Sequence, residues 1–146
     1  MTSLFGPNFS IEVQPEIINI CFINKNCLNL KCILGFLIDL NVNSFFSLTN
    51  CRDEFSFFVP KHIATTLRNQ FGSNINVEPE EYTCLKIFYT DEVDGVSDTG
   101  VVRTISDLFS INNIPILYVN SFNNNFVLIP SYHYTEFVEQ YHLIEH

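Results

Sequence analysis

An acidic loop carries the residues of this chain that are best suited to bind a charged ligand. The stretch TDEVDGVSDTG, residues 90–100, contains four carboxylates and two glycines. Gly100 begins an apolar helical pattern, and the free N–H groups at a helix start attract a carboxylate. Gly95 allows the backbone to approach a ligand closely, and Asp98 suits an ammonium or guanidinium group. We interpret the loop as a candidate ligand site, with a solvated acidic loop as the alternative.

Other chemistry has little support in the sequence. The loop lacks the D-x-[DN]-x-[DN]-G spacing, followed by a glutamate, of an EF-hand calcium site. The five cysteines include no C-x-x-C pair and no zinc spacing with histidine. No G-x-S-x-G, P-loop, HExxH or dinucleotide-binding fingerprint occurs. We therefore expect no catalytic residue, no metal site and no cofactor.

Composition limits the class of partner. The chain has 146 residues and a net charge of −9, with only seven Lys and Arg. Nucleic acids and anionic membrane surfaces are therefore not expected as partners, because binding to either requires clustered basic residues. The longest apolar run, residues 32–40, is far shorter than the roughly 20 residues of a membrane helix. Residues 1–6 lack a signal-peptide pattern. We expect a cytoplasmic protein with reduced, mostly buried thiols.

Hydrophobic periodicity predicts alternating strands and helices. Alternating or β-branched runs indicate strands, and apolar residues spaced three or four apart indicate helices. Proline is expected to break the first run at Pro15, and the polar residues 72–80 to separate two units, 1–78 and 79–146. The strands are expected at residues 9–13, 17–23, 45–49, 55–59, 82–88, 114–120 and 126–129, and the helices at 28–40, 61–70, 100–111 and 132–143.

An internal repeat organises these elements. A shift of 70 residues places Asn43 on Asn113, Asn50 on Asn120 and Pro60 on Pro130. Each copy reads strand, helix, strand, strand, helix, and its hairpin ends at a proline. This order predicts an α+β fold of two ferredoxin-like units, with helices on one face of a mostly antiparallel sheet.

Two stretches carry a resemblance to a known family. The chain resembles the ACT domain, a regulatory module that binds amino acids at interfaces between copies. SFFSLTNCRDEFSFFVP (residues 44–60) and GVSDTGVVRTISDLFSINNIPILYVNSFNNNFVLIP (residues 95–130) are similar to the CASTOR-type ACT proteins, the cytosolic arginine sensors of the TOR pathway. The resemblance implies tandem ACT-like units and a regulatory protein partner. Metazoan members carry two such tandems and this chain has one, so the resemblance implies either a homodimer that rebuilds the four-unit assembly or a simpler single-tandem relative.

The resemblance also implies a set of ligand-binding residues. A glycine, an acidic residue three positions later and a second glycine two beyond line the arginine site of the CASTOR-type pattern. A strand ending in S-T-[YF], a nearby aspartate and a V-S-V stretch on the opposite wall complete it. The corresponding residues of this chain are Gly95, Asp98, Gly100, Ile114, Ile116, Ser121, Phe122 and Asn125.

Three departures from the pattern weaken the expectation of arginine. Asn125 stands where an aspartate is expected, and a neutral carbonyl binds a guanidinium less strongly, by about 1–2 kcal/mol. Ile114-Pro115-Ile116 lacks the serine hydroxyl, and Asp98 is shorter than the usual glutamate. A small amino acid remains compatible. The sequence thus predicts a non-enzymatic module that senses a small molecule, namely an amino acid, at the interface between ACT-like units and controls a partner protein of TOR signalling. The alternative is a ligand-free interaction or scaffold module with a degenerate pocket.

Overall fold

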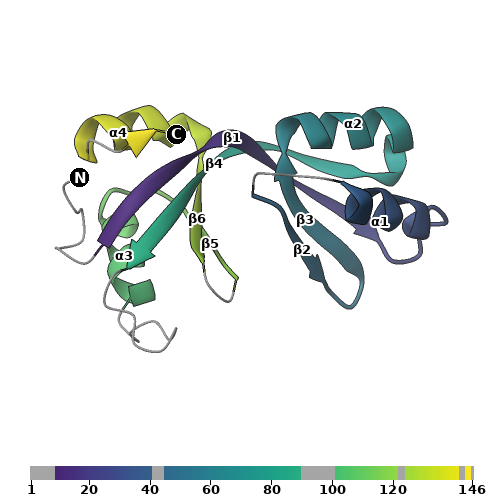
Figure 1. Ribbon diagram of the computed structural model, residues 1–146, viewed down its shortest axis with the longest axis horizontal. Coiled ribbons are helices and arrows are strands. Elements are labelled where there is room, and N and C mark those ends of the chain that lie inside the picture. Colours follow the sequence, from purple (N-terminus) through teal and green to yellow (C-terminus); the bar gives the residue numbers. More distant parts are fainter. Residues whose placement is uncertain (1–8, 41–44, 90–100, 122–123, 142–143, 146) are drawn as a thin grey trace. The chain divides into compact units, whose positions relative to one another are not determined.

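The computed structural model describes residues 9–40, 45–89, 101–121, 124–141 and 144–145 (Figure 1). It divides the chain into two compact units, which we call the inserted unit (residues 16–81) and the flanking unit (residues 1–15 with 82–146). Both combine helices with a mostly antiparallel sheet, which confirms the predicted α+β class. The strands are β1 (Phe9–Asn24), β2 (Ser47–Asn50), β3 (Glu54–Pro60), β4 (Asn76–Tyr89), β5 (Leu117–Asn120), β6 (Asn125–Pro130) and β7 (Ile144–Glu145). The helices are α1 (Leu30–Asp39), α2 (Lys61–Phe71), α3 (Val101–Ile111) and α4 (Tyr134–Tyr141).

In the inserted unit, both helices pack on one face of the strands. The strand order is β2-β3-β1-β4, and β3 is antiparallel to β2 and to β1. Cys21 and Ile23 of β1 and Phe57 and Val59 of β3 lie on the same alternation and form a core with both helices. The helices contribute Ile33, Leu37, Ile63, Ala64 and Leu67. This is the ferredoxin-like arrangement that the order of elements predicts.

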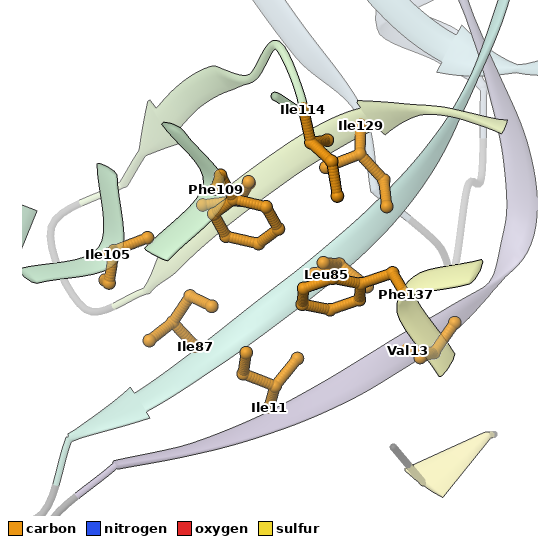
Figure 2. Packing of buried hydrophobic residues seen from close by; sticks show 10 residues of the cluster. Ile11, Val13, Leu85, Ile87, Ile105, Phe109, Ile114, Ile129 and Phe137 are labelled. Carbon is orange, nitrogen blue, oxygen red and sulfur yellow. The ribbon is translucent and has the colours of Figure 1, made fainter. Parts of the chain in front are cut away.

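The flanking unit repeats this arrangement. Its strand order is β1-β4-β6-β5, β6 is antiparallel to both β4 and β5, and β7 pairs with β1 in parallel. Figure 2 shows inward side chains of β1, β4 and β6 meeting those of α3 and α4. The members are Ile11, Val13, Leu85, Ile87, Ile105, Phe109, Ile114, Val127, Ile129 and Phe137.

The two hairpins have the same register. Ser47 pairs with Phe58 in the β2–β3 hairpin, and Leu117 pairs with Leu128 in the β5–β6 hairpin. Both members of the second pair lie 70 residues after their counterparts, which is the spacing of the sequence repeat. A hairpin register depends on the loop and on which alternation is buried, so the repeat preserves both.

β1 and β4 differ most from the predicted elements. β1 is one strand that passes through Pro15, and β4 begins inside the segment expected to be a polar connection. Pro15 lies outside the residues of β1 that pair with β7, Glu12 and Val13, and before Ile18, where pairing with β3 begins. Residues 1–15 are therefore grouped with 82–146 instead of with the first half of the chain.

Some apolar residues at the helical spacing lie at the surface. Ile38 of α1 is 76% exposed and Val102 of α3 is 48% exposed, whereas Ile33 and Ile105 are fully buried. The helical spacing identified the correct helices but made their apolar stripes too wide, because a helix in contact with a sheet on one side buries only a narrow stripe.

The five cysteines are all free thiols. Cys21 and Cys84 are buried, and burial raises the pKa of each thiol to about 12. They therefore stay protonated and poorly nucleophilic near neutral pH. Cys32 and Cys51 are exposed, so the expectation of mostly buried thiols is only partly correct.

Candidate functional site

Half of the predicted ligand-binding residues lie outside the described residues. These are Gly95, Asp98, Gly100 and Phe122. The helix expected after the acidic loop is present, since α3 begins at Val101, directly after Gly100. The positions of Ile114, Ile116, Ser121 and Asn125 are described, and each has a local structural role.

Ile114 belongs to the motif that ends α3. Asn113 has a left-handed backbone, with φ of 55°. The Ile114 N–H donates to the Phe109 carbonyl at 2.9 Å, and the Asn113 N–H donates to the Ser110 carbonyl at 3.0 Å. This is a Schellman C-cap, in which an apolar residue after the left-handed position packs back on the helix. Ile114 accordingly joins Phe109 in the core and is 5% exposed (Figure 2).

Ser121 follows β5 and Asn125 begins β6, so both lie at the turn end of the β5–β6 hairpin. The Ser121 N–H donates to the Asn124 carbonyl at 2.9 Å, and the Asn124 amide nitrogen donates to the Ser121 hydroxyl at 3.2 Å. Asn125 was expected in the tip, but it is the first residue of β6 and pairs with Asn120 and Ile87. The polar residues of this hairpin therefore close its own turn.

The described predicted residues lie at both ends of β5. Ile116 precedes the strand and packs against the core of the flanking unit, whereas Ser121 follows it and is exposed. The five residue steps between them span about 16 Å of extended chain. A ligand that contacts both ends therefore has to extend along β5.

Tyr118 is a candidate that the sequence analysis missed. It lies in β5 and packs against the core of the flanking unit, and its hydroxyl is buried without a hydrogen-bond partner in the described structure. Desolvation raises the pKa of this phenol. A buried polar group without a partner costs about 1–3 kcal/mol, so a ligand that supplies a partner gains that energy. The sequence signal that could have identified Tyr118 is its position in an alternating pattern with Ile114 and Ile116, which places all three side chains toward the core.

Tyr118→Phe tests this role. The substitution removes an unsatisfied buried hydroxyl, so we expect the ligand-free protein to gain about 1 kcal/mol in free energy of unfolding. We expect any stabilisation by a bound amino acid to decrease. Urea unfolding with and without ligand measures both quantities. Tyr132→Phe is the control, because Tyr132 is 71% exposed. Loss of stability on Tyr118→Phe would show that the hydroxyl already has a partner.

Two further properties limit the chemistry of the described residues. They contain no group of three or more His, Cys, Asp or Glu side chains placed to hold a metal ion. They also contain no helix that is both long and apolar enough to cross a membrane.

Comparison with known proteins identifies the fold. No protein-family model and no curated protein matches the chain. Solved structures do. A crystal structure of a protein from Agobacterium tumefaciens has a TM-score of 0.65 at 16% identity, covering 97% of this chain and 96% of that one. The regulatory subunit of aspartate kinase from Thermus flavus has a TM-score of 0.59 at 13% identity, covering 92% and 95%.

A whole enzyme also contains this arrangement. Aspartate kinase from Clostridium acetobutylicum has a TM-score of 0.63 at 16% identity, covering 95% of this chain but only 35% of the enzyme. The neighbours thus include ACT-domain regulatory proteins. The fold is ACT-like. At these identities the likeness concerns the fold alone, and it agrees with the fold that the family resemblance implied.

Proposed function

We propose that this protein is a non-enzymatic regulatory module that binds a free amino acid and thereby controls a partner protein. In this proposal the inserted and flanking units are tandem ACT-like units. Ligand binding favours one arrangement of the units, and this population shift exposes or hides a surface for the partner. The site lies on the flanking unit, at the acidic loop before α3, with Asp98 receiving the cationic group.

One observation carries the proposal. The chain matches a separate regulatory subunit of aspartate kinase over nearly the full length of both chains. Within the aspartate kinase of Clostridium acetobutylicum, the matching part is about a third of the chain. The fold of this chain therefore corresponds to the regulatory subunit in one of these proteins and to about a third of the enzyme in the other, which supports a regulatory role.

The finer features of the proposal come from the sequence resemblance. Arginine is the first ligand to test, because Gly95, Asp98 and Gly100 match the CASTOR-type spacing. The weaker partner at Asn125 makes a smaller amino acid the second choice. A cytoplasmic homodimer that regulates a protein of TOR signalling is the corresponding assembly and pathway.

A thermal-shift panel of the twenty amino acids tests the function. A ligand that binds only the folded state stabilises it by about 2.7 kcal/mol at a hundredfold excess over Kd. We expect one amino acid or a small related group to raise the Tm. We expect Asp98→Ala to abolish most of that shift, because it removes a charge-assisted bond worth about 1.5–3 kcal/mol.

Asp107→Ala is the matched control for that panel. Asp107 lies on α3 and carries the same charge as Asp98. Its side chain is 64% exposed and forms only a loose ion pair, with 3.7 Å between its Oδ2 and Arg103 Nε. This variant is expected to respond like the wild type. If no amino acid changes the Tm of the wild type, the sensor function is refuted.

The second candidate function is a ligand-free interaction module. Exposed apolar side chains of the inserted unit favour it, since Leu28 is fully exposed and Ile38 is 76% exposed. Exposed apolar groups of this kind occur at protein–protein contacts. A negative amino-acid panel together with specific capture of one protein partner that Ile38→Lys abolishes would support this alternative.

A further inference from the structure

An open depression lies on the helix-covered side of the inserted unit. It has a volume of about 460 Å³, within the range of small-molecule sites. Its lining comes from three elements that are far apart in the sequence, namely β1, α2 and the first residues of β4. The residues are Asn19, Lys61, Ala64, Thr65, Arg68, Val77, Glu78 and Pro79.

Asn19 is the unusual residue of this depression. It lies on the same alternation of β1 as the core residues Cys21 and Ile23, and it is only 7% exposed. Among the described residues, none donates a hydrogen bond to its side-chain amide or accepts one from it, yet the amide lines the depression. The amide atoms are not completely shielded from solvent, so a ligand in the depression can replace water as their hydrogen-bond partner.

The remaining polar side chains of the depression are three hydrogen-bond donors and one carboxylate, the exposed Glu78. Lys61, Thr65 and Arg68 follow one another at helical spacing along α2, so they share a face. Lys61 pairs with Glu81 at 2.8 Å. No carboxylate in the described part of the chain pairs with the Arg68 guanidinium. Two of the seven basic residues of a chain with net charge −9 thus line one depression.

The lining has an apolar part as well. Ala64 of α2 and Val77 and Pro79 of β4 contribute to it. A guanidinium prefers a planar anion that it can bind with two hydrogen bonds. A carboxylate on a short hydrocarbon body satisfies the guanidinium, the free amide and the apolar wall together.

We propose that this depression of the inserted unit is a binding site for a small organic carboxylate. Arg68 binds the carboxylate, the Asn19 amide donates a hydrogen bond to it, and the hydrocarbon body packs against Ala64, Val77 and Pro79. The site is independent of the proposed amino-acid site, whose residues belong to the flanking unit. A free amino acid fits through its carboxylate, but its ammonium group is not required.

Calorimetric titration of the full chain tests this site with four matched probes. The probes are isovalerate, which has the carboxylate alone, isobutylamine, which has the ammonium alone, L-valine, which has both, and inorganic phosphate. We expect saturable binding of isovalerate and L-valine with comparable affinity, weaker binding of phosphate, and no binding of isobutylamine. Failure of isovalerate to bind, or tighter binding of phosphate or isobutylamine than of isovalerate, would overturn the assignment.

Three substitutions localise the binding. Arg68→Gln is expected to raise the Kd for isovalerate by roughly tenfold or more, since it removes a charged bidentate contact. Arg103→Gln makes the same change on an 85% exposed residue of α3 and should leave the Kd unchanged. Asn19→Leu removes the amide but keeps a side chain of similar shape. We therefore expect weaker isovalerate binding, together with an equal or greater free energy of unfolding. Equal Kd values in the two arginine variants would refute the site.

Asp98→Ala separates this proposal from the proposed function. That substitution lies in the flanking unit, and isovalerate binding should survive it. If the Asp98→Ala variant no longer responds to amino acids in the thermal-shift panel but still binds isovalerate, the result would support two separate sites. Loss of isovalerate binding in Asp98→Ala would show that the carboxylate binds elsewhere than in the inserted unit.

Discussion

Phe109→Ala is expected to lower the free energy of unfolding by about 3–5 kcal/mol. The ring is fully buried and stacks on Phe137, with ring centroids 4.8 Å apart and an interplanar angle of 21°. Truncation removes this aromatic contact and leaves a cavity between α3, α4 and the sheet (Figure 2). Because small domains are stable by only about 5–15 kcal/mol, the flanking unit would be close to unfolding.

The same substitution is expected to affect ligand binding. Phe109 anchors α3, and the acidic loop with Asp98 directly precedes that helix. We therefore expect any stabilisation by an amino acid to disappear together with the stability of the flanking unit. Urea unfolding followed by circular dichroism measures the first effect, and repetition with saturating ligand measures the second.

Ile111→Ala is the control for Phe109→Ala. Ile111 lies on the same helix but is 78% exposed, so its truncation should change the stability by less than about 0.5 kcal/mol. Similar losses in the two variants would mean that α3 does not pack through Phe109, and the described core of the flanking unit would be wrong.

Phe57→Ala is expected to destabilise the inserted unit by about 3–5 kcal/mol. Phe57 is fully buried in β3, on the face that both helices of this unit cover. Its cross-strand partner Leu48 is 40% exposed and provides the control. Leu48→Ala should cost less than Phe57→Ala by about 2 kcal/mol, because Leu48 is smaller and keeps 40% of its surface exposed in the folded state.

Hydrogen exchange on these two phenylalanine variants tests the division into units. We expect Phe57→Ala to reduce protection first in residues 16–81, and Phe109→Ala to reduce it first in residues 82–141. Local stability differs between cooperative units, and exchange resolves this difference. Uniform loss of protection over the whole chain in both variants would show a single cooperative unit, with β1 and β4 coupling the two cores.

Local patterns in the sequence were enough to predict the helices and both hairpins. All four helices lie where apolar spacing placed them, with ends shifted by a few residues. The strands before Pro60 and Pro130 and their turns follow from alternation and from the asparagines of the repeat. These features depend on residues close together in the chain, so a single sequence contains the information.

The long strands required the tertiary structure. Pro15 in β1 is a local strand breaker, and residues 72–80, where β4 begins, are polar, so the sequence predicted a break at the first and a connection at the second. In the structure, each strand has partners that lie far away in the sequence, and Pro15 of β1 and Pro79 of β4 fall outside the residues paired with β3, β6 and β7. No local pattern records which distant strand will supply the hydrogen bonds.

The sequence by itself determined the class of fold, the repeat and the acidic loop as a candidate site. Only the tertiary structure decided that Ile114 is used to end α3, that the Tyr118 hydroxyl is buried without a partner and that Asn19 lines a depression with Arg68. Asn19 and Arg68 are 49 positions apart. Burial and unmet hydrogen bonds arise only when such distant residues pack together, so composition and spacing cannot reveal them.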